Sequence, residues 1–214
     1  MMTSSTRSYG EDLPFKYVGG DLSLDLVNTV DWTTRGLVDE RLTSYERMTR
    51  WAEGAGTLTA KAGVQLRTLA TAHPRIADRA HRAALELRWQ LRQLFTALDR
   101  GDRFDELGAL DDFNRSLADA GSRLELTPRA RVPATSAPFQ WSWRDNGERL
   151  ESPLWPVIRS AAELLVSEEA TRIHECAGEE CGWMYVDRSR NGLRRWCQME
   201  VCGNREKARR RAGK

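Results

Sequence analysis

The sequence lacks an apolar run long enough to cross a membrane, and its first twelve residues are polar. A membrane-spanning helix needs about 18 consecutive apolar residues, and a secretory signal needs an apolar core that residues 1–12 do not contain. We therefore expect a cytoplasmic protein with no membrane partner and with a flexible arm over residues 1–12. The chain as a whole, with 40% hydrophobic and 30% charged residues, is suited to fold around one main core with a small appended module.

Histidine is scarce, since the chain contains only His73, His81 and His174. These residues are scattered along the sequence and form no histidine metal motif. The sequence also lacks a glycine-rich phosphate loop and a Ser/His/Asp set. We therefore expect that the protein is not an enzyme and has no catalytic residues.

The chain has no overall excess of charge, because 33 Lys and Arg oppose 31 Asp and Glu for a net charge of +2. The charge is unevenly distributed, however. Residues 187–214 hold ten Lys and Arg against three Asp and Glu, a net charge of +7, which leaves −5 on residues 1–186. An acidic body with a basic end is common where only that end meets a polyanion, although a solvated terminal helix has the same composition.

Apolar residues at helical spacing predict several helices. Thr43 and Glu46 form a capping-box pattern at the start of one helix, and a short helix is expected over residues 60–70. The strongest pattern covers residues 76–98, where apolar residues recur every three or four positions. Asp102 is placed to cap a further helix.

The segment before these helices predicts a short strand over residues 15–18 and a helix over residues 22–30. Asp21 is a natural N-cap for this helix. Asp25 and Asn28 then share one face of it.

The apolar period changes to two later in the chain. Alternation over residues 124–126 and 139–143 predicts two antiparallel strands. Residues 146–147 (Asn-Gly) give a strong turn signal. Residues 152–153 (Ser-Pro) supply an N-cap and a first-turn proline for a helix that reaches Leu165.

All four cysteines lie near the end of the chain, at Cys176, Cys181, Cys197 and Cys202. Four residues separate the members of each pair and fifteen separate the pairs, which is typical of a tetrahedral zinc site. In a reducing compartment metal binding explains them better than disulfides, and reduced buried cysteines without metal are the alternative. Because all four ligands are cysteine, no position remains for a catalytic water, so we expect one structural Zn²⁺ per chain.

Around the metal we expect a zinc knuckle, a β-hairpin and a terminal helix. Residues 183–186 and 193–196 would be the arms of the hairpin, and Asn204 would cap the helix. About 40 residues usually bury too little apolar surface to fold unaided, so zinc would supply the missing stability.

The expected fold class is therefore α+β. A mainly helical domain with a small antiparallel sheet would cover residues 13–168, and a four-cysteine zinc module would cover residues 169–214. We place the boundary near residues 167–171, where the apolar pattern is interrupted.

Cationic side chains follow the hairpin and line the terminal helix. On a zinc-anchored helix they can contact phosphates, while Arg and Asn can also bind base edges. The candidate nucleic-acid contacts are Arg188, Arg190, Arg194, Arg195, Asn204, Arg205, Lys207, Arg209, Arg210 and Arg211.

Two stretches, SRNGLRRWC at residues 189–197 and CGNREKAR at residues 202–209, closely resemble the CGNR zinc finger. Near the amino terminus, GDLSLDLVNT at residues 20–29 resembles the start of the ABATE domain that accompanies this finger. The resemblance covers nearly the whole chain and implies a bacterial stress-induced transcription regulator with a DNA-binding finger. It also implies that the four cysteines bind zinc and that residues 203–205 (Gly-Asn-Arg) are signature residues.

We therefore expect a transcription regulator that binds duplex DNA through the finger. The amino-terminal domain would sense a ligand or pair two chains as a homodimer. Asp25, Asn28 and Trp32 are candidates for a pocket that binds a small-molecule effector. The competing interpretation is that they cap, hydrogen bond to backbone or lie in the core.

An RNA-binding zinc protein is the alternative, since Trp183, Tyr185 and Trp196 could stack on unpaired bases. We expect these aromatic side chains to pack around the zinc site instead. A protein-interaction module is a further alternative.

Overall fold

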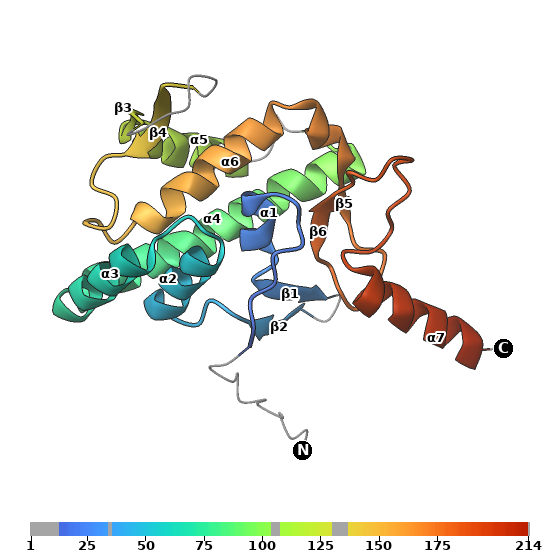
Figure 1. Ribbon diagram of the computed structural model, residues 1–214. Coiled ribbons are helices and arrows are strands. Elements are labelled where there is room, and N and C mark those ends of the chain that lie inside the picture. Colours follow the sequence, from blue (N-terminus) through green and yellow to red (C-terminus); the bar gives the residue numbers. More distant parts are fainter. Residues whose placement is uncertain (1–12, 34–35, 104–107, 130–136, 214) are drawn as a thin grey trace, which may run out of the picture.

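The computed structural model describes residues 13–33, 36–103, 108–129 and 137–213. The predicted flexible arm over residues 1–12 lies outside the described residues. Helices dominate the described part, and its strands form three separate two-stranded antiparallel sheets (Figure 1). The predicted α+β fold class with a mainly helical body is therefore confirmed.

The long helix α4 (Pro74–Arg100) is the centre of the fold. Its apolar residues recur on one face, where Leu87 and Leu91 are buried. Gly101 ends the helix in a left-handed conformation with φ of 70°. The helix predicted over residues 76–98 is thus confirmed, with two more residues at each end.

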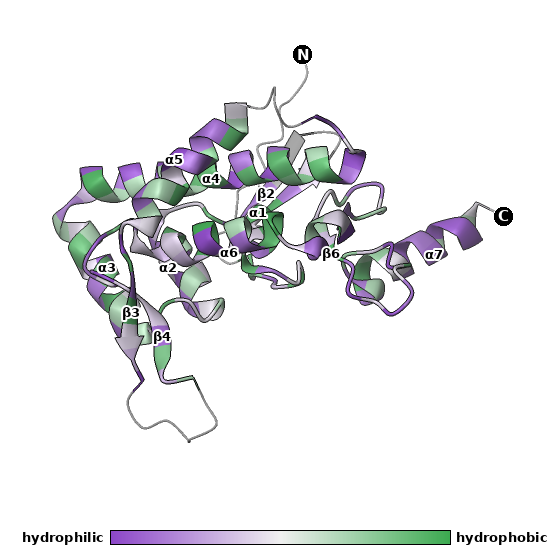
Figure 2. Ribbon diagram, turned by 90° about the horizontal axis from the view of Figure 1, so that it is seen from above, coloured by the Kyte–Doolittle hydropathy of each residue, from purple (hydrophilic) through white to green (hydrophobic). Residues whose placement is uncertain are grey.

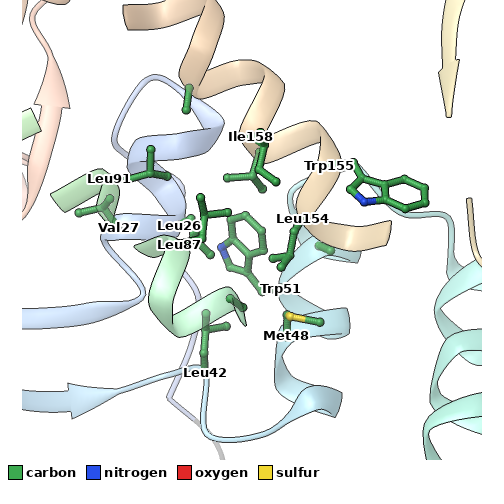
Figure 3. Close-up of a cluster of buried hydrophobic side chains, with 14 of the residues drawn as sticks. Leu26, Val27, Leu42, Met48, Trp51, Leu87, Leu91, Leu154, Trp155 and Ile158 are labelled. Atoms are coloured by element: carbon green, nitrogen blue, oxygen red, sulfur yellow. The ribbon is translucent and has the colours of Figure 1, made fainter. Parts of the chain in front are cut away.

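Five shorter helices pack around α4 or around one another. They are α1 (Leu22–Val27), α2 (Tyr45–Gly54), α3 (Ala60–Ala72), α5 (Gly108–Gly121) and α6 (Trp155–Leu165). Figure 3 shows part of their shared core, in which Trp51 lies among Leu26, Leu87, Leu154 and Ile158. Trp51 is fully buried. The main core therefore joins α1, α2, α4 and α6 into one body.

The amino-terminal segment follows the prediction only in part. Asp21 caps α1 as expected, because its carboxylate accepts a hydrogen bond from the Ser23 amide at 2.8 Å. The helix ends three residues early, since the chain enters strand β1 (Val30–Thr33), which pairs with β2 (Gly36–Glu40). The strand predicted over residues 15–18 is wrong, because this segment runs as irregular backbone and pairs with no strand among the described residues.

Helix α2 starts one residue later than the capping-box pattern predicted. Ser44 is the N-cap in place of Thr43, since its hydroxyl accepts a hydrogen bond from the Arg47 amide at 3.2 Å. Glu46 lies near Arg50, with 3.5 Å between their charged atoms. Adjacent hydroxyl residues offer the same capping chemistry, so sequence alone could not choose between them.

The start of α6 also differs from the prediction. Residues Ser152–Leu154 form a short 3₁₀ turn before the helix, and the Ser152 hydroxyl accepts a hydrogen bond from the Gly147 amide at 3.3 Å. Ser152 therefore closes the preceding turn and does not cap α6. The predicted cap at Asp102 leads into residues 104–107, which lie outside the described residues.

The predicted hairpin in the second half of the body is confirmed. Strand β3 (Leu124–Pro128) pairs with β4 (Phe139–Trp143), with Leu124 opposite Trp143. Trp143 packs on Trp155 at a ring distance of 5.9 Å, which attaches the hairpin to α6.

The last sheet corrects the predicted zinc hairpin. Strand β6 (Met184–Val186) pairs with β5 (Ile173–Glu175), and residues 193–196 form no strand. Residues Ile173, Met184 and Val186 belong to the main core, so burial against the body favours this pairing. Within the described ranges, no helix is both long and apolar enough to cross a membrane.

Candidate metal centre and nucleic-acid surface

Four thiols meet at one point in the carboxy-terminal segment. The Sγ atoms of Cys176, Cys181, Cys197 and Cys202 all lie within 4.8 Å of one another. Cys197 Sγ lies 3.5 Å from Cys181 Sγ and 3.6 Å from Cys202 Sγ. Sulfur atoms bound tetrahedrally at about 2.3 Å from zinc lie about 3.8 Å apart, so the spacing fits a single zinc ion.

Backbone hydrogen bonds hold the thiols in place. The Cys176 amide donates to the Trp183 carbonyl at 2.7 Å, and the Cys197 amide donates to Cys176 Sγ at 3.3 Å. The Cys202 amide donates to the Gln198 carbonyl at 3.0 Å, which closes the second loop. An amide that donates to a ligand sulfur orients it and stabilises its thiolate form.

The thiols need a cation in order to ionise together. Hydrogen bonding with its neighbours, Cys181 first, lowers the pKa of the Cys176 thiol, and hydrogen bonding with Cys176 raises the pKa of the Cys181 thiol. One thiolate therefore keeps its neighbour protonated. A bound Zn²⁺ removes this conflict, because it holds each coordinating thiol deprotonated.

Aromatic side chains pack beside the thiols. Trp183 and Tyr185 are buried and form a small cluster with Cys176, Cys197 and Cys202. The Trp183 indole donates to the Val30 carbonyl at 3.1 Å, and the Tyr185 hydroxyl donates to the Arg194 carbonyl at 2.7 Å. The half-buried Trp196 packs against the same cluster. The expectation that these aromatics pack around the zinc site is confirmed.

Asn28 joins the metal-binding segment to the body. Its Nδ2 donates to the Met184 carbonyl at 2.8 Å, and its Oδ1 accepts from the Met184 amide at 2.9 Å. Asn28 is 2% exposed, so both of its polar atoms are used within the protein. The side chain thus behaves as a strand partner for β6.

The three residues predicted for an effector pocket each hydrogen bond to backbone. Asn28 pairs with Met184, and Asp25 Oδ1 accepts a hydrogen bond from the Gly19 amide at 2.8 Å. Trp32 donates from its indole to the Val27 carbonyl at 2.8 Å. These bonds agree with the competing interpretation of Asp25 and Asn28, while Trp32 also lines a cavity beside α4. The effector pocket itself stays a prediction.

A close backbone contact also fixes the first zinc loop. Gly182 has φ of 65°, and a Cβ atom there would lie 1.7 Å from the Trp32 carbonyl oxygen. Arg92 of α4 donates to the Gly182 carbonyl at 2.6 Å and pairs with Glu175 at 2.6 Å. The loop therefore sits directly on β1 and α4, and only glycine fits at position 182.

The second zinc loop continues into a terminal helix. Residues Met199–Gly203 form a π-type turn, and α7 (Asn204–Ala212) follows directly. The predicted cap is wrong, because Gly203 is the N-cap and Asn204 is already helical, with Nδ2 donating to the Glu200 carbonyl at 3.1 Å. The metal loop itself starts the helix, so no side-chain cap is needed.

Helix α7 projects from the body and is strongly hydrophilic (Figures 1 and 2). None of its residues is buried. Arg205, Lys207, Arg210 and Arg211 lie on it and make no ion pair with described residues. Arg190 and Arg195, on the segment between the two cysteine pairs, are also exposed and free of such pairs.

Three predicted contact residues are engaged within the protein. Arg188 pairs with Glu169, with 2.7 Å between Nε and Oε1. The Arg194 guanidinium donates to backbone carbonyls, including those of Trp196 at 3.0 Å and Cys197 at 2.5 Å. Arg209 pairs with Glu179 of the first zinc loop and with Glu206 at 3.3 Å, which fixes α7 against that loop.

Asp187 was missed by the sequence analysis. It is 1% exposed, and its carboxylate accepts hydrogen bonds from the Ser189 amide at 2.8 Å and the Arg194 amide at 2.9 Å. It therefore shapes the segment that returns to Cys197. The Asp-x-Ser pattern is typical of this kind of turn and could have indicated it.

These features define a class of protein: a helical body that carries a four-cysteine zinc module with a cationic terminal helix. The ABATE family model, described as "Putative stress-induced transcription regulator", matches residues 20–168, and the CGNR zinc finger model matches residues 172–213. The chain therefore belongs to the ABATE family and carries a CGNR zinc finger, whose four cysteines form the site for one structural Zn²⁺. Neither model describes an enzyme. A search of curated proteins gives no match.

Proposed function

We propose that this protein is a stress-induced transcription regulator that binds duplex DNA through its zinc finger. The observation that carries the proposal is the cationic helix α7, which starts at the metal loop and buries none of its residues. A rigidly held helix with cations on its surface can approach the phosphates of a duplex or enter the major groove.

The cations divide into two proposed roles. The six that are free of ion pairs with described residues would neutralise phosphates; they are Arg190, Arg195, Arg205, Lys207, Arg210 and Arg211. Arg188, Arg194 and Arg209 would position the loops and the helix, because their guanidinium groups already bind acids or carbonyls. Asn204 lies at the start of α7, where its amide could contact a base edge.

Duplex DNA is favoured over single-stranded RNA by the burial of the aromatic residues. Trp183 and Tyr185 are 5% and 1% exposed and Trp196 is half-buried, so two of the three candidate rings are not available to stack on bases. Recognition of unpaired RNA depends on such stacking. The cationic helix α7 is therefore a stronger candidate for the nucleic-acid contact surface than these aromatic residues.

The domain over residues 13–168 would regulate the finger over residues 169–214, either by sensing an effector or by pairing two chains. Two fingers in a homodimer would read two half-sites, which raises both affinity and specificity. The body and finger share core residues of β5 and β6, so a change in the body could reach the finger.

The test is fluorescence anisotropy of the zinc-loaded full chain with duplex DNA and with a hairpin RNA, over a range of salt concentrations. The double variant Arg210→Ala/Arg211→Ala should weaken DNA binding and reduce the magnitude of the salt slope by about 2. Arg75→Ala/Arg79→Ala, at the far end of α4 from the finger, is the matched control and should bind like the wild type (Figure 1). Tighter binding to RNA, or equal losses in both double variants, would contradict the proposal.

A further inference from the structure

A cavity of about 480 Å³ lies where α4 meets the first zinc loop. Trp89, Gln93, Thr96 and Arg100 of α4 line it on one side, and the loop that carries Gly178 and Glu179 lines it on the other. Its volume is in the range of small-molecule sites, which occur preferentially between structural units.

The cavity has an aromatic wall. The Trp89 ring lies 5.5 Å from that of Trp32, at an interplanar angle of 30°. The Arg92 guanidinium lies 5.3 Å from the Trp32 ring centre. Trp32 is half-buried and also lines the cavity, whereas Trp89 is 53% exposed. An indole so exposed beside a cavity offers a surface on which a planar ring can stack.

Most charged groups around the cavity are already paired. Glu175 pairs with Arg92 at 2.6 Å, and Glu179 pairs with Arg209. Arg100 is exposed and has no ion pair with a described residue. Asp102, which follows the end of the helix after Gly101, also lines the cavity and has no ion pair with a described residue. Arg100 is therefore the cation at this cavity that can receive a ligand anion.

Hydrogen-bond donors follow the α4 wall. Gln93, Thr96 and Arg100 are spaced by three and four residues, so they lie along one face of the helix together with Trp89. The Thr96 hydroxyl oxygen is buried and has no hydrogen-bond partner among the described residues, so Gln93 and Arg100 are the donors considered for this wall. Side chains on a helix lean toward its amino terminus, which directs Arg100 back along this face toward Trp89.

We propose that this cavity binds a small aromatic carboxylic acid. The ring would stack on Trp89 and the carboxylate would pair with the Arg100 guanidinium, with Gln93 donating along the α4 wall. An arginine can bind a carboxylate through two parallel hydrogen bonds, which fixes both the position and the orientation of the ligand.

The opposite wall connects the ligand site to the metal centre. Glu179 lies between Cys176 and Cys181 and also pairs with Arg209 of α7. A ligand in the cavity would therefore contact the loop that holds two of the four zinc ligands. Ligand binding itself does not depend on the proposed DNA activity, so the two proposals can fail separately.

The test is isothermal titration calorimetry of the zinc-loaded full chain with 2-naphthoate and with 2-naphthylmethylamine, which has the same ring and the opposite charge. The carboxylate should bind at least about tenfold more tightly than the amine. Trp89→Ala and Arg100→Gln should each weaken naphthoate binding by about tenfold or more.

The matched controls are Trp141→Ala, whose ring is equally exposed at 53% on β4, and Arg79→Gln, on an earlier turn of α4. Both should bind within about twofold of the wild type. Because Arg100 is exposed, its variant tests the site even if Trp89→Ala fails to fold. Absence of saturable naphthoate binding up to about 5 mM, equal or tighter binding of the amine, or wild-type affinity in Arg100→Gln would overturn the proposal.

Discussion

Single residues join the body of this protein to its zinc finger. Asn28 is the clearest example, because its amide makes two hydrogen bonds to the backbone of Met184, which lies 156 positions later in the chain. The spacing of Asn28 and Asp25 on one helix face was visible in the sequence, but their partners were not. A polar residue that pairs with distant backbone leaves no local pattern.

Asn28→Ala should reduce the free energy of unfolding by about 2–4 kcal/mol, because it leaves a buried amide and a buried carbonyl of Met184 without partners. Urea unfolding measures this change. Asn191→Ala, at an exposed position, is the matched control and should change stability by less than about 0.5 kcal/mol. Equal stability of the two variants would show that Asn28 does not hold β6.

Asp25 makes the stability of the body depend on pH. Burial raises its pKa to about 6, against hydrogen bonds from Gly19 and Val18 that lower it. Between about pH 4 and 6 the folded state then binds more protons than the unfolded state, so stability falls as the pH rises through this window. Above about pH 6 the carboxylate is ionised in the folded state, and its burial lowers the free energy of unfolding by a constant amount.

Asp25→Asn removes this charge while keeping an oxygen that can accept from Gly19. We expect it to stabilise the protein by about 1–2 kcal/mol at pH 8 and to have little effect at pH 4. Urea unfolding at both pH values measures the difference, with Asp78→Asn on the exposed face of α4 as the control. A variant that is less stable than the wild type at pH 8 would refute this role.

At the scale of elements, the sequence patterns predicted those helices, hairpins and metal ligands that depend on residues close together in the chain. Helix α4 and the β3–β4 hairpin follow from apolar spacing, and the four zinc ligands follow from cysteine spacing alone. The pairing of β5 with β6 was not predictable, because the zinc loop separates the strands and the body selects the partner. The sequence also could not show which arginines would form ion pairs with acidic residues, as Arg209 does with Glu179.

Zinc removal should therefore unfold the finger only in part. Ile173, Met184 and Val186 are buried in the main core, whereas the segment after residue 187 depends on the metal for its fixed loops. Hydrogen exchange after chelation should show lost protection at Cys197, Cys202 and along α7. The Val186 amide, which donates to Gly19 at 2.8 Å, should stay protected. Loss of protection across β5 and β6 as well would contradict this division.

At the scale of the whole molecule, the helical body and the zinc finger are not independent domains, because they share a packed interface. The sheet of β5 and β6 belongs to the finger in sequence and to the main core in packing. Arg92, Asn28 and Gly182 add direct contacts between the two parts. The body therefore holds the first zinc loop in place, and Arg209 of α7 pairs with Glu179 of that loop.

The central claim is that zinc orders a cationic surface that reads duplex DNA. Selection of bound fragments from a random duplex pool by the zinc-loaded protein, beside a Cys197→Ala variant, tests it most directly. We predict that a short motif is enriched by the wild type and not by the variant, with a symmetric motif if two chains bind together. No enrichment by the zinc-loaded protein, or the same enrichment by Cys197→Ala, would contradict the claim.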